Sequence, residues 1–225
     1  MISIIIPALN EELRIAGLIR DLDALPGAKE IIVADGQSED RTADVAAAAG
    51  AIVIQCGRGR GTQLHKGAMV ASGDVLWFIH ADSIPAPESI GAVDRALQDP
   101  RTVAGNFTLI FEGQSLAARS MTWIYPKLKL LGLSYGDAGI FVRRTAYDAI
   151  DGFRPLHLFE DLDFVRRLKP LGRFVTLKCH LFTSSRRFEG KRNYLGAWVK
   201  WIALQLLYWA GVSPDWLANW YRPIR

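Results

Sequence analysis

The first half of the chain alternates short apolar runs with stretches in which apolar residues recur at helical spacing. The runs cover Ile2–Ile6, Ile31–Ala34, Ala51–Ile54 and Val75–Ile79. Short, almost wholly apolar runs predict strands that are buried on both faces. Because helical stretches separate these runs, we expect a doubly wound α/β domain with a mostly parallel sheet.

The stretches between the runs carry helix start signals. Asn10 is a favoured N-cap, and we expect it to begin a helix at about Glu11. Ser38-Glu39-Asp40 opens a second helix, which ends at Gly50, and a third covers Gln63–Ser72. Farther along, strands are expected at Val103–Phe111, Ile140–Arg143 and Phe174–Leu177, and helices at Thr145–Ile150 and Glu160–Leu168.

Composition narrows the possible classes of protein. Half of the residues are hydrophobic and 22% are charged, as in folded globular chains. The formal net charge is +4, but the basic residues are scattered, which favours anionic small molecules or anionic lipid over nucleic acid. Cys56 and Cys179 match no metal-ligand spacing, so we expect unpaired thiols and a cytoplasmic location, with a disulfide as the alternative. Ile2–Ile6, cut short by Pro7, is interpreted as a strand and not as a signal peptide.

His80 and Asp82 follow the fourth apolar run, at the edge of the sheet where ligands bind in such folds. A carboxylate there can hold Mg²⁺ or Mn²⁺ against a diphosphate, because these metals take oxygen ligands and share their shell with phosphate. The alternative is that Asp82 only caps a helix that begins near Pro85–Glu88.

Two other acidic segments have similar positions. Asp35 ends the second run and could accept a hydrogen bond from a nucleobase or ribose, although Asp35-Gly36 is also a strong turn signal. Glu160 and Asp161 begin an expected helix, where one of them could serve as a general base toward an acceptor hydroxyl. The alternative is that both acids only complement the helix dipole.

Two loops could bind an anion. The segment Gly57–Gly61 contains Arg58 and Arg60 but does not fit the Walker pattern. The second loop contains Arg186 and Arg187, and its alternative is an exposed basic loop. The dispersed histidines form no hydrolase motif.

Four segments occur together and in one order. They are Ile-Ile-Pro-Ala-Leu-Asn-Glu-Glu (5–12), Val-Ala-Asp-Gly-Gln-Ser-Glu-Asp-Arg-Thr (33–42), Gly-Asp-Val-Leu-Trp-Phe-Ile-His-Ala-Asp (73–82) and Phe-Glu-Asp-Leu-Asp-Phe (159–164). Residues 1–190 thereby resemble family 2 glycosyltransferases, with small bacterial members, including a group associated with arsenosugar biosynthesis, as the nearest likeness. The resemblance implies a GT-A fold, a nucleoside-diphosphate sugar donor, with a UDP-sugar favoured, and inversion at the anomeric carbon.

The resemblance also implies roles for individual residues. Asp161, paired with Glu160, would be the catalytic base, and His80-Ala81-Asp82 lies where the family has its Asp-x-Asp metal motif. His80 departs from that motif and suits Mn²⁺ better than Mg²⁺, which leaves Asp82 as the expected protein ligand. The residues expected to contact the nucleotide sugar are Pro7, Ala8, Glu11, Asp35, Arg60, Lys66, Ala81, Arg186 and Arg187.

The segment 191–225 is interpreted as a hydrophobic helical appendage to a catalytic domain at 1–190. Between Tyr194 and Gly211 only Lys200 and Gln205 are clearly polar, and five of the seven tryptophans lie beyond residue 190. A helix here could dock on the domain, form a homodimer contact, or lie on the inner face of the cell membrane. Lys200 argues against a fourth arrangement, a membrane span.

Two other functions are compatible with such a sheet. A sugar-phosphate nucleotidyltransferase would carry its glycine-rich loop directly after the first strand, whereas Gly57–Gly61 follows the third. A non-catalytic nucleotide-sugar-binding protein is the other alternative, against which the presence of Asp35, Asp82 and Asp161 together counts.

Overall fold

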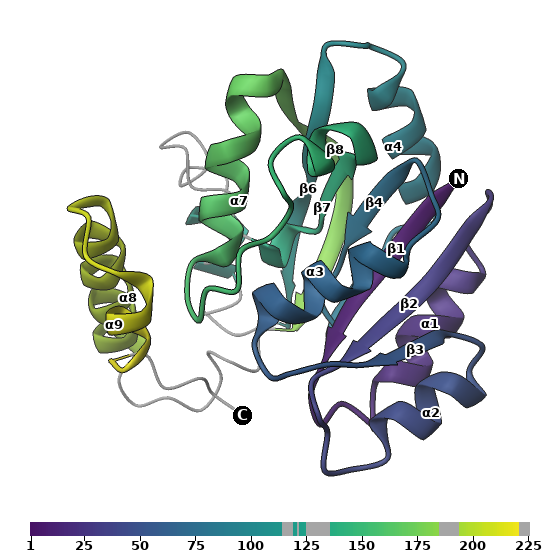
Figure 1. The fold of residues 1–225 in the computed structure, drawn as a ribbon, viewed down its shortest axis with the longest axis horizontal. Coiled ribbons are helices and arrows are strands. Elements are labelled where there is room, and N and C mark those ends of the chain that lie inside the picture. The colour runs from purple at the N-terminus through teal and green to yellow at the C-terminus, as the bar shows by residue number, and fades with distance from the viewer. Residues whose placement is uncertain (114–118, 121, 125–135, 185–193, 221–225) are drawn as a thin grey trace.

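The computed structural model describes residues 1–113, 119–120, 122–124, 136–184 and 194–220. Their strands are β1 (Ile2–Ala8), β2 (Lys29–Asp35), β3 (Ile52–Gln55), β4 (Val75–Phe78), β5 (Ser83–Pro85), β6 (Thr102–Glu112), β7 (Ile140–Arg143) and β8 (Arg173–Ser184). They form one sheet in the order β3-β2-β1-β4-β7-β6-β8-β5 (Figure 1). Strands β7 and β5 run antiparallel to their neighbours, and the other pairings are parallel.

Helices cover both faces of this sheet. They are α1 (Ile15–Asp23), α2 (Thr42–Ala48), α3 (Arg60–Val70), α4 (Ser89–Leu97), α6 (Arg144–Asp148) and α7 (Glu160–Leu168). Alternate residues of β1 point to opposite layers, because side chains of a strand alternate between its faces. Ile4 and Ile6 pack in the core with α1, α2 and α4, whereas Ile5 packs in the core with α3, α6 and α7. The expected doubly wound α/β architecture is therefore confirmed.

Several expected helix starts are wrong. Asn10 has a left-handed backbone (φ 56°), and its side-chain oxygen accepts from the Glu39 N–H at 2.8 Å instead of capping a helix. Helix α1 begins only at Ile15, and α2 begins at Thr42 and not at Ser38. Asp82 does not cap α4, because β5 intervenes and α4 begins at Ser89.

The described C-terminal residues form two packed helices, α8 (Tyr194–Trp209) and α9 (Pro214–Ala218), at the left of Figure 1. Leu204 and Leu217 are buried in the same core as Leu158 and Phe159, next to α7. Asp215 of α9 lies 2.8 Å from the His157 ring nitrogen. The pair is thus docked on the α/β domain, and no described helix is long and apolar enough to cross a membrane.

Candidate active site

The first turns of α3 and α7 meet at the carboxyl edge of the parallel strands. Arg60, the first residue of α3, forms an ion pair through Nε with the Glu160 carboxylate, and its guanidinium lies 4.0 Å from Asp161 Oδ2. Gly61 permits this approach because it has no side chain: a Cβ there would clash with the Arg154 carbonyl oxygen in the loop before α7 and would lie 3.3 Å from Glu160 Cβ. Residues 100 positions apart in sequence are thereby joined in one cluster of charges.

Asp161 is 5% exposed and accepts hydrogen bonds from two backbone N–H groups. The Gly136 N–H donates to Oδ2 at 2.6 Å, and the Leu162 N–H donates to Oδ1 at 2.8 Å. Burial, with the neighbouring charge of Glu160, raises the pKa of Asp161 to about 6, and Arg60 and the Gly136 N–H oppose this rise. The carboxyl group can therefore exchange a proton near neutral pH.

His80 faces the same cluster from the end of β4. Its Nδ1 lies 3.1 Å from Asp137 Oδ1. A Cβ added to Gly136 would be 3.3 Å from Asp161 Oδ2 and 3.4 Å from His80 Nε2, so both side chains border this glycine. His80 and Asp161 are thus brought together, with the Gly136 backbone between them.

The residues expected to hold a divalent metal are Asp82, which is half-buried, and His80, whose Nδ1 faces Asp137. Among the residues that the structure describes, no three His, Cys, Asp or Glu side chains are grouped as metal ligands. Mg²⁺ and Mn²⁺ commonly complete their shell with substrate phosphate and water. A carboxylate and an imidazole are chemically suited to a metal that shares its shell with a diphosphate, and the imidazole would favour Mn²⁺, so a metal at Asp82 and His80 stays a prediction.

Asp35 is buried at the end of β2, where its carboxylate accepts hydrogen bonds from the Ser38 hydroxyl and from the Ser38 N–H, the latter at 3.1 Å. These contacts close the loop after β2, in which Gln37 has a left-handed backbone (φ 64°). The neighbouring Gln63, on α3, donates from Nε2 to the carbonyl oxygens of Ala8 and Ala34, at 2.8 and 2.9 Å. The amide therefore fixes the carboxyl ends of β1 and β2 next to Asp35.

Comparison with known proteins agrees with this arrangement. Residues 3–157 match Glycosyl transferase family 2. The chain belongs to this family. Its residues also superpose on glucosyl-3-phosphoglycerate synthase from Mycobacterium tuberculosis, solved with Mn²⁺, uridine diphosphate and phosphoglyceric acid, with a TM-score of 0.65, 25% identity, and coverage of 92% of this chain and 78% of that one. The expected GT-A fold is confirmed, since the structural neighbours of this family 2 chain are GT-A enzymes.

Other relatives share shorter stretches. A 4,4'-diaponeurosporenoate glycosyltransferase of Staphylococcus haemolyticus is 37% identical over 89 residues, which cover 36% of this chain and 24% of that protein. The uncharacterized glycosyltransferase Rv0539 of Mycobacterium tuberculosis is 34% identical over 82 residues, 36% of each chain. The matched segments thus span about a quarter to a third of these curated relatives. The narrower likeness to the arsenosugar-associated group stays a prediction.

The other residues that the family resemblance implied as nucleotide-sugar contacts differ in their burial and position. Ala8 and Ala81 are buried, and Pro7 and Glu11 are half-buried near the end of β1. Lys66 is exposed on α3 and lines an open pocket of about 350 Å³ together with Arg154, outside the Arg60–Asp161 cluster. Arg186 and Arg187 lie outside the described residues, so their expected role in holding diphosphate stays a prediction.

The sequence analysis missed Gly136 and Asp137, which contact the two central side chains. They precede β7, which is antiparallel to β4, so the start of β7 lies at the same edge as the end of β4. A Gly-Asp turn signal ahead of Ile140–Arg143 was available. Its relevance depended on strand direction, which the apolar pattern of β7 does not reveal.

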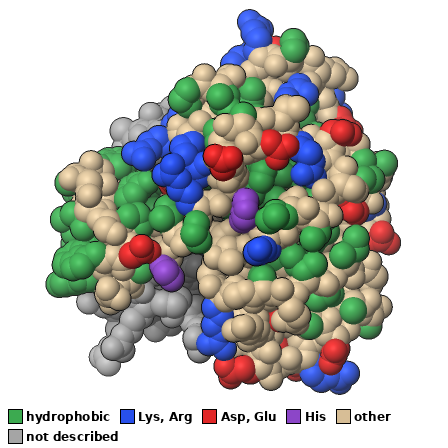
Figure 2. Space-filling model, viewed as in Figure 1, with side chains coloured by type: hydrophobic (Ala, Val, Ile, Leu, Met, Phe, Trp, Pro, Cys, Tyr) green, Lys and Arg blue, Asp and Glu red, His purple; other side chains and the backbone are tan. Residues whose placement is uncertain are grey.

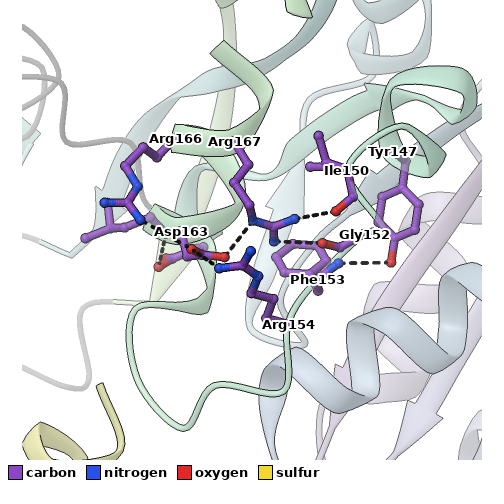
Figure 3. A network of polar contacts seen from close by, with 10 residues as sticks. Tyr147, Ile150, Gly152, Phe153, Arg154, Asp163, Arg166 and Arg167 are labelled. Carbon is purple, nitrogen blue, oxygen red and sulfur yellow. Dashed lines mark hydrogen bonds and ion pairs between the residues drawn. The ribbon is translucent and has the colours of Figure 1, made fainter. Parts of the chain in front are cut away.

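Asp163, also missed, organises the loop that leads into α7 (Figure 3). Its carboxylate is 3% exposed and pairs with Arg167 at 2.8 Å, Arg154 at 3.4 Å and Arg166 at 3.8 Å. Arg167 also donates to the carbonyl oxygens of Ile150 and Gly152, at 2.6 and 2.7 Å. This network fastens the loop to α7 and so supports the position of Glu160 and Asp161.

Proposed function

We propose that this family 2 protein transfers a sugar from a nucleoside-diphosphate sugar to an acceptor hydroxyl, with inversion at the anomeric carbon and with Asp161 as the general base. Family membership and the GT-A fold support a glycosyltransferase. Uridine diphosphate in the glucosyl-3-phosphoglycerate synthase structure supports a UDP-sugar as the first donor to test. We further propose that residues 1–190 form the catalytic domain and that the reaction takes place in the cytoplasm.

The environment of Asp161 carries this proposal. A general base works best when its pKa lies near the working pH, and burial beside Glu160 moves the pKa of Asp161 toward that range. The Gly136 N–H, 2.6 Å from Oδ2, holds the carboxylate in one orientation. An aspartate that served only the helix dipole would need neither burial nor this anchor.

The transfer itself breaks one bond and forms another. The acceptor oxygen bonds to the anomeric carbon from the face opposite the diphosphate, and the bond between that carbon and the diphosphate oxygen breaks. The acceptor proton moves to Asp161, and the electron pair leaves with the nucleoside diphosphate. Arg60 balances the negative charge of Glu160 and Asp161 before the proton arrives.

Asp82 and His80 would hold a divalent metal in this proposal. Such a metal supplies a Lewis acid that neutralises charge on the departing diphosphate. Arg186 and Arg187 are proposed to contact the same diphosphate, and Asp35 the nucleobase. Mn²⁺ in the glucosyl-3-phosphoglycerate synthase structure supports Mn²⁺ as the first metal to test.

Binding and turnover can be tested separately with sugar nucleotides. UDP-, GDP-, dTDP- and CMP-sugars, with and without Mn²⁺, are screened by thermal shift, and release of the nucleotide is then measured for the sugar that binds. We expect Asp161→Asn to bind this donor as the wild type does and to release nucleotide at least about a hundredfold more slowly. Asp148→Asn is the control. Turnover of Asp161→Asn at the wild-type rate would remove Asp161 from the role.

Two other functions stay as alternatives. The glycine-rich loop follows β3 rather than β1, which does not favour a nucleotidyltransferase. A protein that only binds nucleotide sugars would show the thermal shift without nucleotide release in the same assay.

A further inference from the structure

Helix α8 has two apolar faces. On the inner face, Leu204 and Tyr208 pack in the core that contains Phe159. On the outer face, Val199, Ile202, Leu206 and Trp209 recur at helical spacing, with exposed fractions of 60, 45, 57 and 54%. A helix that only covers a domain turns polar side chains outward, so docking explains the inner face but not the outer one.

Exposed apolar side chains are concentrated on this helical pair. Seven of the fifteen large hydrophobic residues that are exposed among the described residues belong to α8 and α9 or directly follow them. Figure 2 shows hydrophobic side chains gathered over α8 and α9 at its left edge. Trp216 and Trp220 add two indole rings, with centroids 5.4 Å apart. Tryptophan is the side chain most typical of the boundary between water and lipid.

The excess positive charge of the chain coincides with this segment. Residues 191–225 contain five basic residues, of which Lys200 alone lies among the described residues, and a single acid, a net charge of +4 that equals the charge of the whole chain. Residues 1–190 contain 22 basic and 22 acidic residues and are neutral.

We propose that the outer face of α8 and α9 binds an anionic membrane surface, with the helices lying in the plane of the lipid head groups. Apolar side chains enter the interface while the basic residues attract anionic lipid. A second copy of this chain is the less favourable occupant, since a symmetric contact would bring two segments of net charge +4 together. The proposal concerns binding alone and does not depend on the proposed transfer reaction.

Vesicle flotation of the full chain tests the proposal. We expect the protein to float with vesicles of phosphatidylcholine and phosphatidylglycerol, and not with phosphatidylcholine alone, because the surface charge of the lipid is then absent. High salt should release it, since salt screens that attraction. Val199→Glu combined with Ile202→Glu should lower the bound fraction by about tenfold or more, because each places a charge at the apolar contact.

Val70→Glu is the matched control, because Val70 is also an exposed valine at 50%, on α3 and remote from the helical pair. It should float as the wild type does. Equal flotation of the Val199 and Ile202 variant, or binding that ignores lipid charge, would overturn the proposal. Failure to bind either vesicle would do so as well. A concentration-dependent dimer that the same variant dissociates, in sedimentation without lipid, would assign the face to a second copy.

Discussion

The ring of Tyr208 lies against the ring of Phe159, with their centroids 4.9 Å apart. Phe159 immediately precedes Glu160 and Asp161 and has a left-handed backbone, with φ 61°. This conformation is strained for a bulky side chain and persists only where surrounding contacts enforce it. The C-terminal helix α8 therefore supports the backbone from which the proposed base projects.

Removing this support should slow catalysis without preventing donor binding. We expect Tyr208→Ala to lower kcat by about tenfold or more, because small displacements of a reacting group are costly, and to leave the donor KM nearly unchanged. Steady-state kinetics with the donor found in the screen measure both. Tyr208→Phe keeps the ring and should behave as the wild type. A larger change in KM than in kcat would place Tyr208 in donor binding instead.

The pKa of Asp161 predicts the acid side of the pH profile. A base acts in its deprotonated form, so kcat/KM should rise with pH and level off above the pKa of about 6. Initial rates at subsaturating donor across pH 5 to 8 report this limb of the free enzyme. A flat profile over this range would show that Asp161 does not carry the titration.

Arg60→Gln should move the same limb to higher pH, because Arg60 lowers the pKa of Asp161. It should also destabilise the fold by about 2 kcal/mol, less than for a fully buried pair because the Arg60 side chain is 34% exposed. Urea unfolding and the pH profile give the two measurements. Arg58→Gln is the matched control, since Arg58 belongs to the same loop but pairs with Glu39 on the surface. Identical behaviour of the two variants would contradict the role of Arg60.

Asp161 should also reduce stability at neutral pH. Its folded pKa of about 6 lies above the unfolded value of 3.8, so folding favours the protonated form. At pH values below the unfolded pKa, Asp161 is protonated in both states and costs no stability. As the pH rises from the unfolded to the folded pKa, the loss in the free energy of unfolding grows to about 3 kcal/mol. Asp161→Asn should therefore melt roughly 6 to 12 °C higher at pH 8 but not at pH 4. Melting curves at both values check this, and an equal shift at both would point to a cause other than ionisation.

Metal preference should follow from Asp82 and His80. We expect Mn²⁺ to strengthen UDP binding more than Mg²⁺ does, because imidazole is a poor ligand for Mg²⁺. Calorimetric titration of UDP with each metal measures the difference. Asp82→Asn should abolish the effect of both metals, whereas His80→Asn should reduce only the advantage of Mn²⁺. An unchanged response of Asp82→Asn would exclude this aspartate as the ligand.

The pattern of apolar residues predicted the strands at the centre of the sheet, but Ala51–Ile54, expected to be buried on both faces, forms the edge strand β3, in which Ile52 is 49% exposed. Ile140–Arg143 and Glu160–Leu168 were expected with the bounds that the structure shows. Strand β8 continues beside β6 well past its expected end at Leu177. The end was placed at Leu177 because Lys178 and His180 interrupt the run of apolar residues. Leu177, Cys179 and Leu181 face the core while Lys178 and His180 face solvent, so the alternation typical of a half-buried strand was present and was missed.

The site was harder to predict than the sheet. The acidic residues that follow the parallel strands could be predicted as site residues, because the carboxyl ends of parallel strands lie at one edge of the sheet. The partners Gly136 and Asp137 did not, because they reach that edge only through the reversed direction of β7. Asn10 was misjudged because its side chain joins two loops, accepting from the Glu39 N–H, a contact between distant segments that local propensity does not encode.

Helix α3 carries Gln63, which is hydrogen-bonded to the ends of β1 and β2, and Arg60, which is paired with Glu160. The two residues lie within one turn of the same rigid helix. Any shift of α3 would therefore move the Asp35 end and the Asp161 end of the proposed site together. One rigid helix therefore sets the spacing between the two ends of the proposed site.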